Sequence, residues 1–180
     1  MPARRTNIVL IGFMGSGKSS IGKLVAGRMG FQFMDTDAVI AKRAGMAIPA
    51  IFAQFGEERF REMETAAIES LAQFTRCVIA TGGGAVLQER NRALLRELGF
   101  VVCLTASEET IYERVARNSK RPLLQTENPR ETVTKMLAAR QSLYQETADL
   151  MLDTTTFSRE QAGDAVIAAA RRGFSWQVAE

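Results

Sequence analysis

The sequence contains no histidine in its 180 residues. This absence excludes catalytic triads that use an imidazole base and metal sites built on imidazole ligands. Proton transfer must therefore use carboxylates, lysine, tyrosine, cysteine or water. The only cysteines, Cys77 and Cys103, each lie in a short apolar run and are not in a CxxC pattern. We expect two buried, reduced thiols rather than a disulfide or a zinc site.

Long apolar runs are also missing. The mean hydropathy is -0.06, and no run approaches the roughly 20 apolar residues that a membrane helix needs. Residues 8–11 are too few for the apolar region of a signal peptide. The formal net charge of +3 suits an anionic small ligand but is too small to indicate a nucleic-acid partner. We therefore expect a cytoplasmic protein that binds neither nucleic acid nor membrane.

The length and the absence of repeats or linkers indicate one domain, residues 1–180. Short apolar, strand-like runs alternate with longer helical segments. We expect strands at residues 7–11, 31–34, 77–80, 100–104 and 150–153. We expect helices at residues 18–29, 38–71 (interrupted at Gly45, Pro49 and Gly56), 88–98, 107–116, 129–148 and 158–172. This alternation predicts an α/β fold of three layers, with a five-stranded parallel sheet between helices.

A glycine-rich phosphate loop follows the first predicted strand. Residues 12–19, GFMGSGKS, match G-x-x-x-x-G-K-[ST] and lead into the first helix. The glycines let backbone N–H groups converge on phosphate oxygens at a helix N-terminus. Lys18 would reach the β- and γ-phosphates, and Ser19 would bind Mg²⁺. The predicted nucleotide-binding residues of this loop are Gly15, Ser16, Gly17, Lys18, Ser19 and Ser20. The motif does not distinguish a kinase from a GTPase or an ATPase.

Asp35-Thr36-Asp37 closes the second predicted strand. Ligands of open α/β sheets bind at that edge, so one carboxylate could face the metal and the other a substrate hydroxyl. The alternative is a helix N-cap followed by an acidic first turn.

Three further segments each have a functional and an ordinary interpretation. Glu64 follows Arg61 by three residues on a predicted helix, where it either orients the arginine or forms a surface ion pair. The run at residues 82–84 is GGG, which allows a ligand to approach the backbone or forms a flexible turn. The basic loop at residues 117–124 could close over a phosphoryl group or remain solvated.

Together, the motifs resemble those of shikimate kinases. The matching segments are GFMGSGKSS, FMDTD, IFAQFGEERFREME, TGGGAV, RPLL and ARQSLY, in that order over about residues 7–155. The resemblance implies a P-loop NTPase fold, a monomer and a role in making aromatic amino acids. The implied reaction transfers the γ-phosphoryl group of ATP, with Mg²⁺, to the 3-hydroxyl of shikimate.

The resemblance also implies roles for single residues on the acceptor side. Asp37 would contact the ring hydroxyls and could deprotonate the one that attacks. Arg61 and Arg140 would hold the shikimate carboxylate, with backbone contacts from the triple-glycine run: Gly82, Gly83 and Gly84. Glu64 would orient Arg61. The pocket walls would be Phe52 and Phe60.

On the nucleotide side, Asp35 and Ser19 would organise the metal. Lys18 and Arg121 would stabilise the transferring phosphoryl group, and Arg117 would stack on adenine. The implied catalytic residues are Lys18, Asp37 and Arg121. A second adenine-contacting segment has no sharp match, and its candidates are Thr156 and Arg159.

The resemblance divides the chain into a core at about residues 7–172, a substrate-binding helical region at about 35–72 and a mobile lid at about 114–126. Two alternatives to shikimate kinase stay open. One is another small-molecule P-loop kinase, acting on gluconate or a nucleoside monophosphate. The other is a kinase-like sensing module that binds its ligand without turnover.

Overall fold

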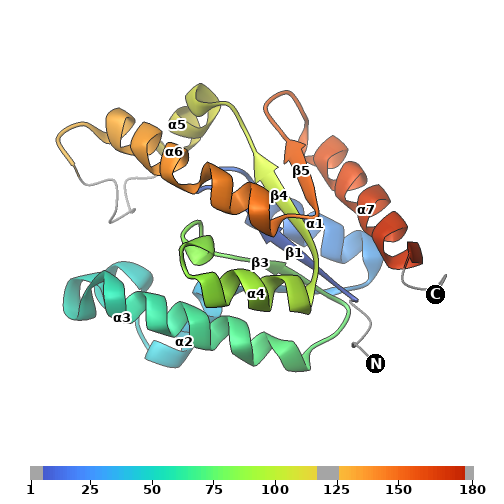
Figure 1. The fold of residues 1–180 in the computed structure, drawn as a ribbon, viewed down its shortest axis with the longest axis horizontal. Helices are drawn as coiled ribbons and strands as arrows, with labels where there is room; N and C mark the ends of the chain where they lie inside the picture. Colours follow the sequence, from blue (N-terminus) through green and yellow to red (C-terminus); the bar gives the residue numbers. More distant parts are fainter. Residues whose placement is uncertain (1–5, 117–125, 177–180) are drawn as a thin grey trace.

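A five-stranded parallel sheet forms the centre of the computed structural model, which describes residues 6–116 and 126–176 (Figure 1). Its strand order is β2-β3-β1-β4-β5, and every neighbouring pair is parallel. The strands are β1 (Asn7–Ile11), β2 (Gln32–Asp35), β3 (Cys77–Ala80), β4 (Gly99–Thr105) and β5 (Leu150–Asp153). All five agree with the prediction to within one or two residues at each end.

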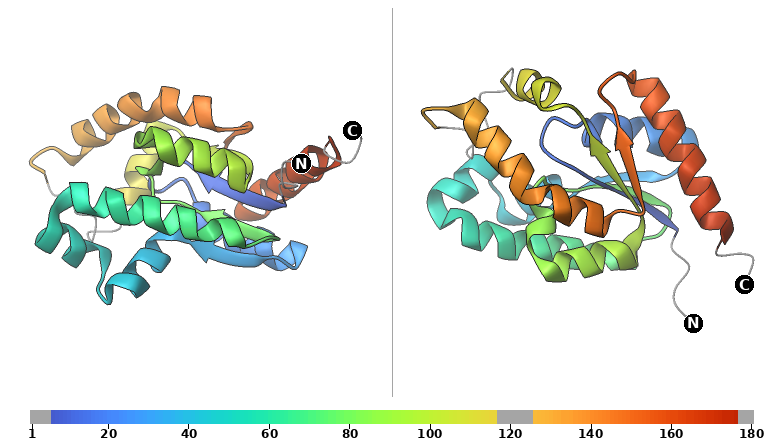
Figure 2. Two further views of the ribbon diagram at one scale, coloured as in Figure 1. Left: turned by 60° about the horizontal axis from the view of Figure 1, so that its bottom comes forward. Right: turned by 45° about the horizontal axis from the view of Figure 1, so that its top comes forward.

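Helices cover both faces of the sheet (Figures 1 and 2). They are α1 (Lys18–Met29), α2 (Thr36–Ala44), α3 (Ile48–Ser70), α4 (Glu89–Leu98), α5 (Glu108–Ala116), α6 (Pro129–Thr147) and α7 (Arg159–Trp176), with short 3₁₀ turns η1 (Leu71–Gln73) and η2 (Ala85–Leu87). The predicted three-layer arrangement is confirmed. The final helix runs four residues beyond its predicted end at residue 172, and the second begins two residues early because Asp35 caps it.

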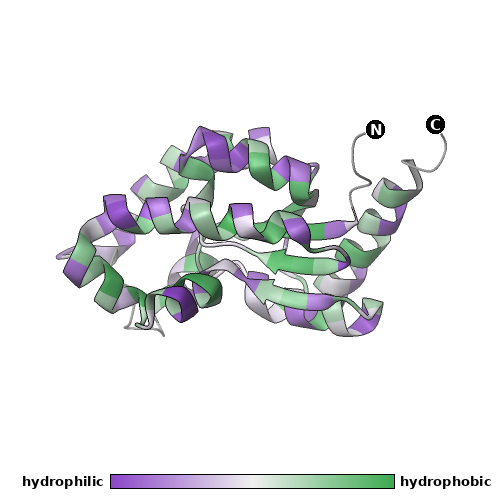
Figure 3. Ribbon diagram, turned by 90° about the horizontal axis from the view of Figure 1, so that it is seen from below, coloured by the Kyte–Doolittle hydropathy of each residue, from purple (hydrophilic) through white to green (hydrophobic). Residues whose placement is uncertain are grey.

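The alternation of side chains along β1 explains the two core layers. Ile8 and Leu10 point to the face covered by α1 and α7, whereas Val9 and Ile11 point to the face covered by α3, α4, α5 and α6. All four side chains are fully buried. The central strands β1 and β3 are buried along their whole length. In Figure 3 the middle of the sheet is mainly hydrophobic, and hydrophilic bands appear on the strand at its near edge.

The break inside α3 occurs at Gly56, as predicted. Gly56 has φ 78° and ψ 176°, a conformation that disfavours side chains with a Cβ. The helix resumes beyond it and carries Phe60, Arg61 and Glu64 on its buried face. The interruption therefore separates a short N-terminal segment of α3 from the segment that faces the sheet.

No single helix in the described ranges is long and apolar enough to cross a membrane. The bent combination of α2 with α3 and η1 passes that test on length and composition alone. Cys77 and Cys103 are both buried free thiols, as expected, and burial raises the pKa of Cys103 to about 12.

The side chain of Asn7 joins the starts of three strands. Its Nδ2 donates to the carbonyl oxygens of Phe74, at 2.9 Å, and Leu98, at 3.1 Å. Its Oδ1 accepts from the backbone N–H of Cys77 at 2.9 Å. Asn7 is only 3% exposed, so water cannot readily replace these partners.

We predict that Asn7→Ala lowers the free energy of unfolding by about 3 kcal/mol, because it leaves buried backbone groups without partners. Urea unfolding would measure the loss. Asn128→Ala is the matched control: Asn128 is the exposed N-cap of α6, and its loss should cost about 1 kcal/mol. Equal losses in the two variants would contradict the role given to Asn7.

Candidate active site

The phosphate loop lies between β1 and α1, at the carboxyl edge of the sheet. Gly15 and Gly17 have φ values of 79° and 98°, which favour glycine. The Lys18 ammonium donates to the carbonyl oxygens of Gly12, at 2.7 Å, and Phe13, at 2.9 Å. Ser16 Oγ is buried and has no hydrogen-bond partner among the described residues. A cradle with an unsatisfied buried hydroxyl at a helix N-terminus suits phosphate oxygens.

A cavity of about 270 Å³ joins this loop to the other predicted polar segments. It is lined by Met14, Gly15, Gly17, Lys18, Ser19, Ser20, Asp35, Asp37, Thr81, Gly82 and Gly83. The structure thus brings together the phosphate loop, the Asp35–Asp37 segment and part of the triple-glycine run, which are far apart in the sequence.

Asp35 both caps α2 and faces the phosphate loop, so the helix-cap and the metal-facing interpretations of its segment are compatible. Its Oδ1 accepts from the backbone N–H of Asp37 at 2.9 Å and so caps α2. Its Oδ2 accepts from the hydroxyl of Ser19 at 2.9 Å. The hydroxyl oxygen of Ser19 and Oδ2 of Asp35 are suitable ligands for a hard divalent cation that also binds phosphates and water. The described residues contain no cluster of three or more His, Cys, Asp or Glu that could hold a metal ion.

Arg61 and Glu64 form a buried ion pair on α3, not the surface pair that their spacing alone favours. Arg61 Nη1 donates to Glu64 Oε2 at 2.9 Å, and the Glu64 side chain is fully buried. Arg61 Nη2 donates to Glu57 at 2.9 Å from the other side, where Glu57 is half-exposed. The guanidinium therefore has two carboxylates fixing its plane.

Burial is the main influence on the pKa of Glu64. It raises that pKa above 4.5, the negative charge of Asp37 raises it further, and the charges of Arg61 and Arg140 oppose the change. For Arg61, burial lowers the pKa, but Glu64 and Glu57 more than offset the effect, so the pKa rises above its ordinary value. The guanidinium therefore keeps its charge although it is buried.

Each of the three glycines at residues 82–84 lies against a different part of the site. A Cβ at Gly82 would lie 2.7 Å from Glu64 Oε1 and 3.0 Å from Asp37 Oδ1. At Gly83 it would lie 3.1 Å from the backbone nitrogen of Met14, and at Gly84 it would lie 2.6 Å from Arg61 Cζ. The run is thus a tightly packed turn that brings the backbone against charged groups, rather than a flexible one.

Arg140 approaches the same turn from α6. Its Nη1 donates to the Gly83 carbonyl at 3.3 Å, and its Cζ lies 5.5 Å from the centre of the Phe13 ring. Tyr144, one helical turn later, donates to the same carbonyl at 2.6 Å. Two buried guanidinium groups, Arg61 and Arg140, therefore contact adjacent residues of one turn.

The two predicted wall residues lie together on α3. The rings of Phe52 and Phe60 have centroids 4.6 Å apart, and the Arg61 guanidinium lies 5.3 Å from the Phe60 ring centre. Phe60 is buried, whereas Phe52 is partly exposed. The rings thus extend the apolar side of the region beside Arg61.

Several predicted nucleotide contacts fall at the edge of the described chain or beyond it. Arg117 and Arg121 lie outside the described residues. Arg114, at the start of the predicted lid, donates to the Gly15 carbonyl at 3.2 Å. Thr156 and Arg159 are exposed, and Arg159 pairs with Glu160. The loop before them is close to the phosphate loop, because Thr154 Oγ1 donates to the Ser16 carbonyl at 3.5 Å.

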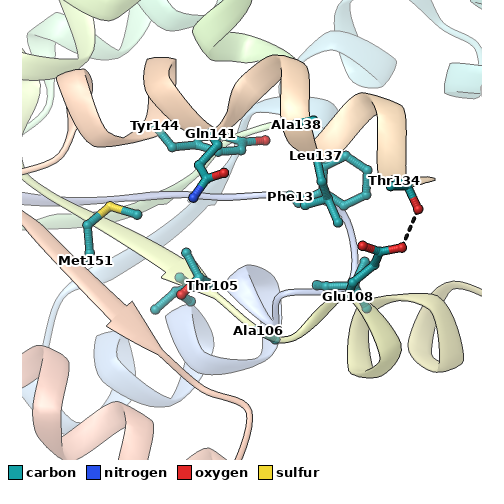
Figure 4. A pocket seen from close by; sticks show the side chains of 12 residues that line it. Phe13, Thr105, Ala106, Glu108, Thr134, Leu137, Ala138, Gln141, Tyr144 and Met151 are labelled. Carbon is teal, nitrogen blue, oxygen red and sulfur yellow. Dashed lines mark hydrogen bonds between the residues drawn. The ribbon is translucent and has the colours of Figure 1, made fainter. Parts of the chain in front are cut away.

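A separate cavity of about 410 Å³ lies between α6 and the β4–β5 edge (Figure 4). Phe13 and Tyr144 form part of its wall, and Glu108, hydrogen-bonded to Thr134, lies at one side. No lysine or arginine is among its described lining residues. Most of the described lining side chains are apolar, whereas the cavity at the phosphate loop is lined by Lys18, Asp35 and Asp37.

Sequence reasoning missed Tyr144 and Thr36. The hydroxyl of Thr36 accepts from the backbone N–H of Gly82 at 3.1 Å, so it also holds the glycine turn. Tyr144 follows Arg140 by four residues, and this spacing would have placed both on one helix face. For Thr36 there was no such local signal, because its partner is 46 residues away.

Comparison with known proteins agrees with this geometry. A family model for shikimate kinase matches residues 14–171. A curated shikimate kinase from Thermodesulfovibrio yellowstonii is 49% identical over 161 residues, which cover 89% of this chain and 92% of that protein. Another, from Geobacter sulfurreducens, is 51% identical over 160 residues, covering 89% and 88%.

A solved structure gives the same result. The shikimate kinase from Acinetobacter baumannii, in complex with shikimate, is similar with a TM-score of 0.87 and 36% identity. The similarity covers 97% of this chain and 95% of that one. Because the sequence matches span most of the chain and the fold agrees throughout, this chain belongs to the shikimate kinase family.

Proposed function

We propose that this protein transfers the γ-phosphoryl group of ATP to the 3-hydroxyl of shikimate, giving shikimate 3-phosphate and ADP. The observation that carries the proposal is the pair of buried guanidinium groups of Arg61 and Arg140 on one glycine turn, beside Asp37 and the phosphate loop. Shikimate is a small ring with one carboxylate and three hydroxyls. Two arginines suit the carboxylate, and an aspartate suits a hydroxyl.

Positioning is the first contribution of the site. Arg61 is fixed by Glu57 and Glu64, and Arg140 rests on the Phe13 ring. With the carboxylate held there, the ring hydroxyls lie towards Asp37, which lines the cavity of the phosphate loop. Fixing the acceptor next to the donor turns a bimolecular reaction into an effectively intramolecular one.

Proton and charge transfer follow from the same arrangement. The acceptor oxygen forms a bond to the γ-phosphorus while the bond from that phosphorus to the bridging oxygen of ADP breaks. Asp37 accepts the hydroxyl proton. Lys18 and the backbone N–H groups of the loop stabilise the charge on the phosphates. These groups perform the reaction without an imidazole, in agreement with the absence of histidine.

Family membership implies ATP together with a divalent metal ion. We propose Mg²⁺ held by Ser19 and Asp35, whose oxygens lie 2.9 Å apart. When bound, Mg²⁺ would neutralise phosphate charge. The proposed adenine contact of Arg117 and phosphoryl contact of Arg121 rest on the resemblance alone.

We also propose that residues 1–180 act as a single domain and a monomer in the cytoplasm. A reducing compartment with ATP would keep Cys77 and Cys103 as the free thiols found here.

The first test measures ADP release with ATP and Mg²⁺ against shikimate, quinate, gluconate and nucleoside monophosphates. We expect turnover to depend on shikimate. Preference for gluconate or a nucleotide would support a different small-molecule kinase. ATP binding without turnover on any acceptor would support a sensing module.

Asp37→Asn should lower kcat by about 10²- to 10³-fold, because the hydroxyl loses its proton acceptor. The affinity for ATP should change by less than about threefold, as measured by calorimetry. The control is Asp164→Asn, which should retain activity. Asp164 lies on α7, where it is exposed and pairs with Arg28 of α1. Near-normal turnover in Asp37→Asn would remove Asp37 from the proposed role.

The variants Glu64→Gln and Glu57→Gln test how much each of the two carboxylates contributes to the orientation of Arg61. We expect the KM for shikimate to rise about tenfold or more in Glu64→Gln, because a buried charged partner is lost. It should rise less than about threefold in Glu57→Gln, because Glu57 is half-exposed and its pairing is screened. Steady-state kinetics at saturating ATP would decide. Similar KM values for the two variants would count against burial as the basis of the orientation.

A further inference from the structure

We propose that Tyr144 is a positioning residue for Arg140, acting through the carbonyl oxygen of Gly83. This inference rests on the proposed function, in which Arg140 binds the carboxylate of shikimate. Tyr144 donates to that carbonyl at 2.6 Å, and Arg140 donates to it at 3.3 Å. The two side chains lie four residues apart on one face of α6, and both are almost fully buried.

The two hydrogen bonds differ in strength. At 2.6 Å the tyrosine bond is short, whereas the arginine bond, at 3.3 Å, is slightly longer than the usual N–H···O range. Tyr144 therefore supplies the main donor that the Gly83 carbonyl needs in a buried position. The Arg140 guanidinium donates to this carbonyl and also lies within hydrogen-bonding reach of the Tyr144 hydroxyl. The other N–H groups of this guanidinium can serve a carboxylate.

The hydroxyl is well suited to this task. Burial is the largest influence on the pKa of Tyr144 and raises it above the ordinary value of 10, so the hydroxyl remains a donor at neutral pH. Its acceptor is a backbone atom. Tyr144 thus acts on the acceptor site through Gly83 rather than on the substrate.

Gly83 also packs against the phosphate loop. A Cβ at Gly83 would lie 3.1 Å from the Met14 nitrogen and 3.5 Å from the Gly12 carbonyl oxygen. The Tyr144 bond therefore ties α6, which carries Arg140, to a turn that touches the nucleotide loop. Without the hydroxyl, the carbonyl would draw Arg140 towards itself and away from the carboxylate.

Tyr144→Phe keeps the ring and removes only the hydroxyl. We expect the KM for shikimate to rise about 5- to 20-fold, while kcat stays within about threefold and the KM for ATP within about twofold. A purely structural role would lower the amount of active enzyme without changing the KM for one substrate. The matched control is Tyr112→Phe, at a tyrosine of α5 whose ring packs against Arg130; all three constants should stay within about twofold.

A double-mutant cycle with Arg140→Lys tests whether Tyr144 acts through Arg140. In that background, Tyr144→Phe should raise the KM for shikimate by less than about twofold. An unchanged KM in the single variant, or a full additional rise in the double variant, would overturn the proposal. Failure of the proposed function is distinguishable, because the wild-type protein itself would then show no shikimate-dependent turnover.

Discussion

The parallel pairing of β1 with β3 is the contact on which the active site depends. Val9 pairs with Ile79 and Leu10 with Ala80, and the backbone N–H of Thr81 continues the pairing to the Leu10 carbonyl. The two strands therefore end at the same level. The phosphate loop that follows β1 and the glycine turn that follows β3 leave the sheet side by side, although about 70 residues separate them in the chain.

The position of β2 completes this arrangement. Asp35, its last residue, pairs with Ala80 on the other side of β3. Asp35, the proposed metal ligand, and Asp37, the proposed ligand of the acceptor hydroxyl, thus lie at the same edge as the glycine turn. Three separate segments converge because the carboxyl ends of parallel strands meet there, and this placement requires no long-range ordering of flexible loops.

Charge is balanced across the glycine turn. Glu64 and Asp37 both approach Gly82, while Arg61 lies against Gly84 and Arg140 contacts the Gly83 carbonyl. Removing two charges from water costs about as much free energy as their attraction returns, so a buried ion pair adds little to stability. The Arg61–Glu64 pair is therefore better explained by the orientation it gives to Arg61. The absence of side chains at residues 82–84 allows these four charged groups to approach one backbone segment. A Cβ at Gly82 or Gly84 would occupy the space they use.

The family resemblance led us to propose residues for the acceptor site, but it did not predict their contacts. Arg61 and Glu64 were expected as partners from their spacing, but that spacing alone favoured an exposed pair. Their burial results from the packing of α3 near the glycine turn, which a local pattern cannot show. Tyr144 was not among the expected site residues, although its spacing from Arg140 places both on one face of α6. Its bond to Gly83 joins residues 61 positions apart, which a local pattern does not show.

The sequence by itself determined the five strands, the phosphate loop and the break at Gly56. These features depend on hydrophobic periodicity and on the local backbone freedom of glycine, which act over a few neighbouring residues. Only the tertiary structure decided the strand order, the burial of Glu64 and the hydrogen bonds that Tyr144 and Arg140 both donate to the Gly83 carbonyl. Those properties arise from contacts between distant segments, and such contacts exist only after the sheet has assembled.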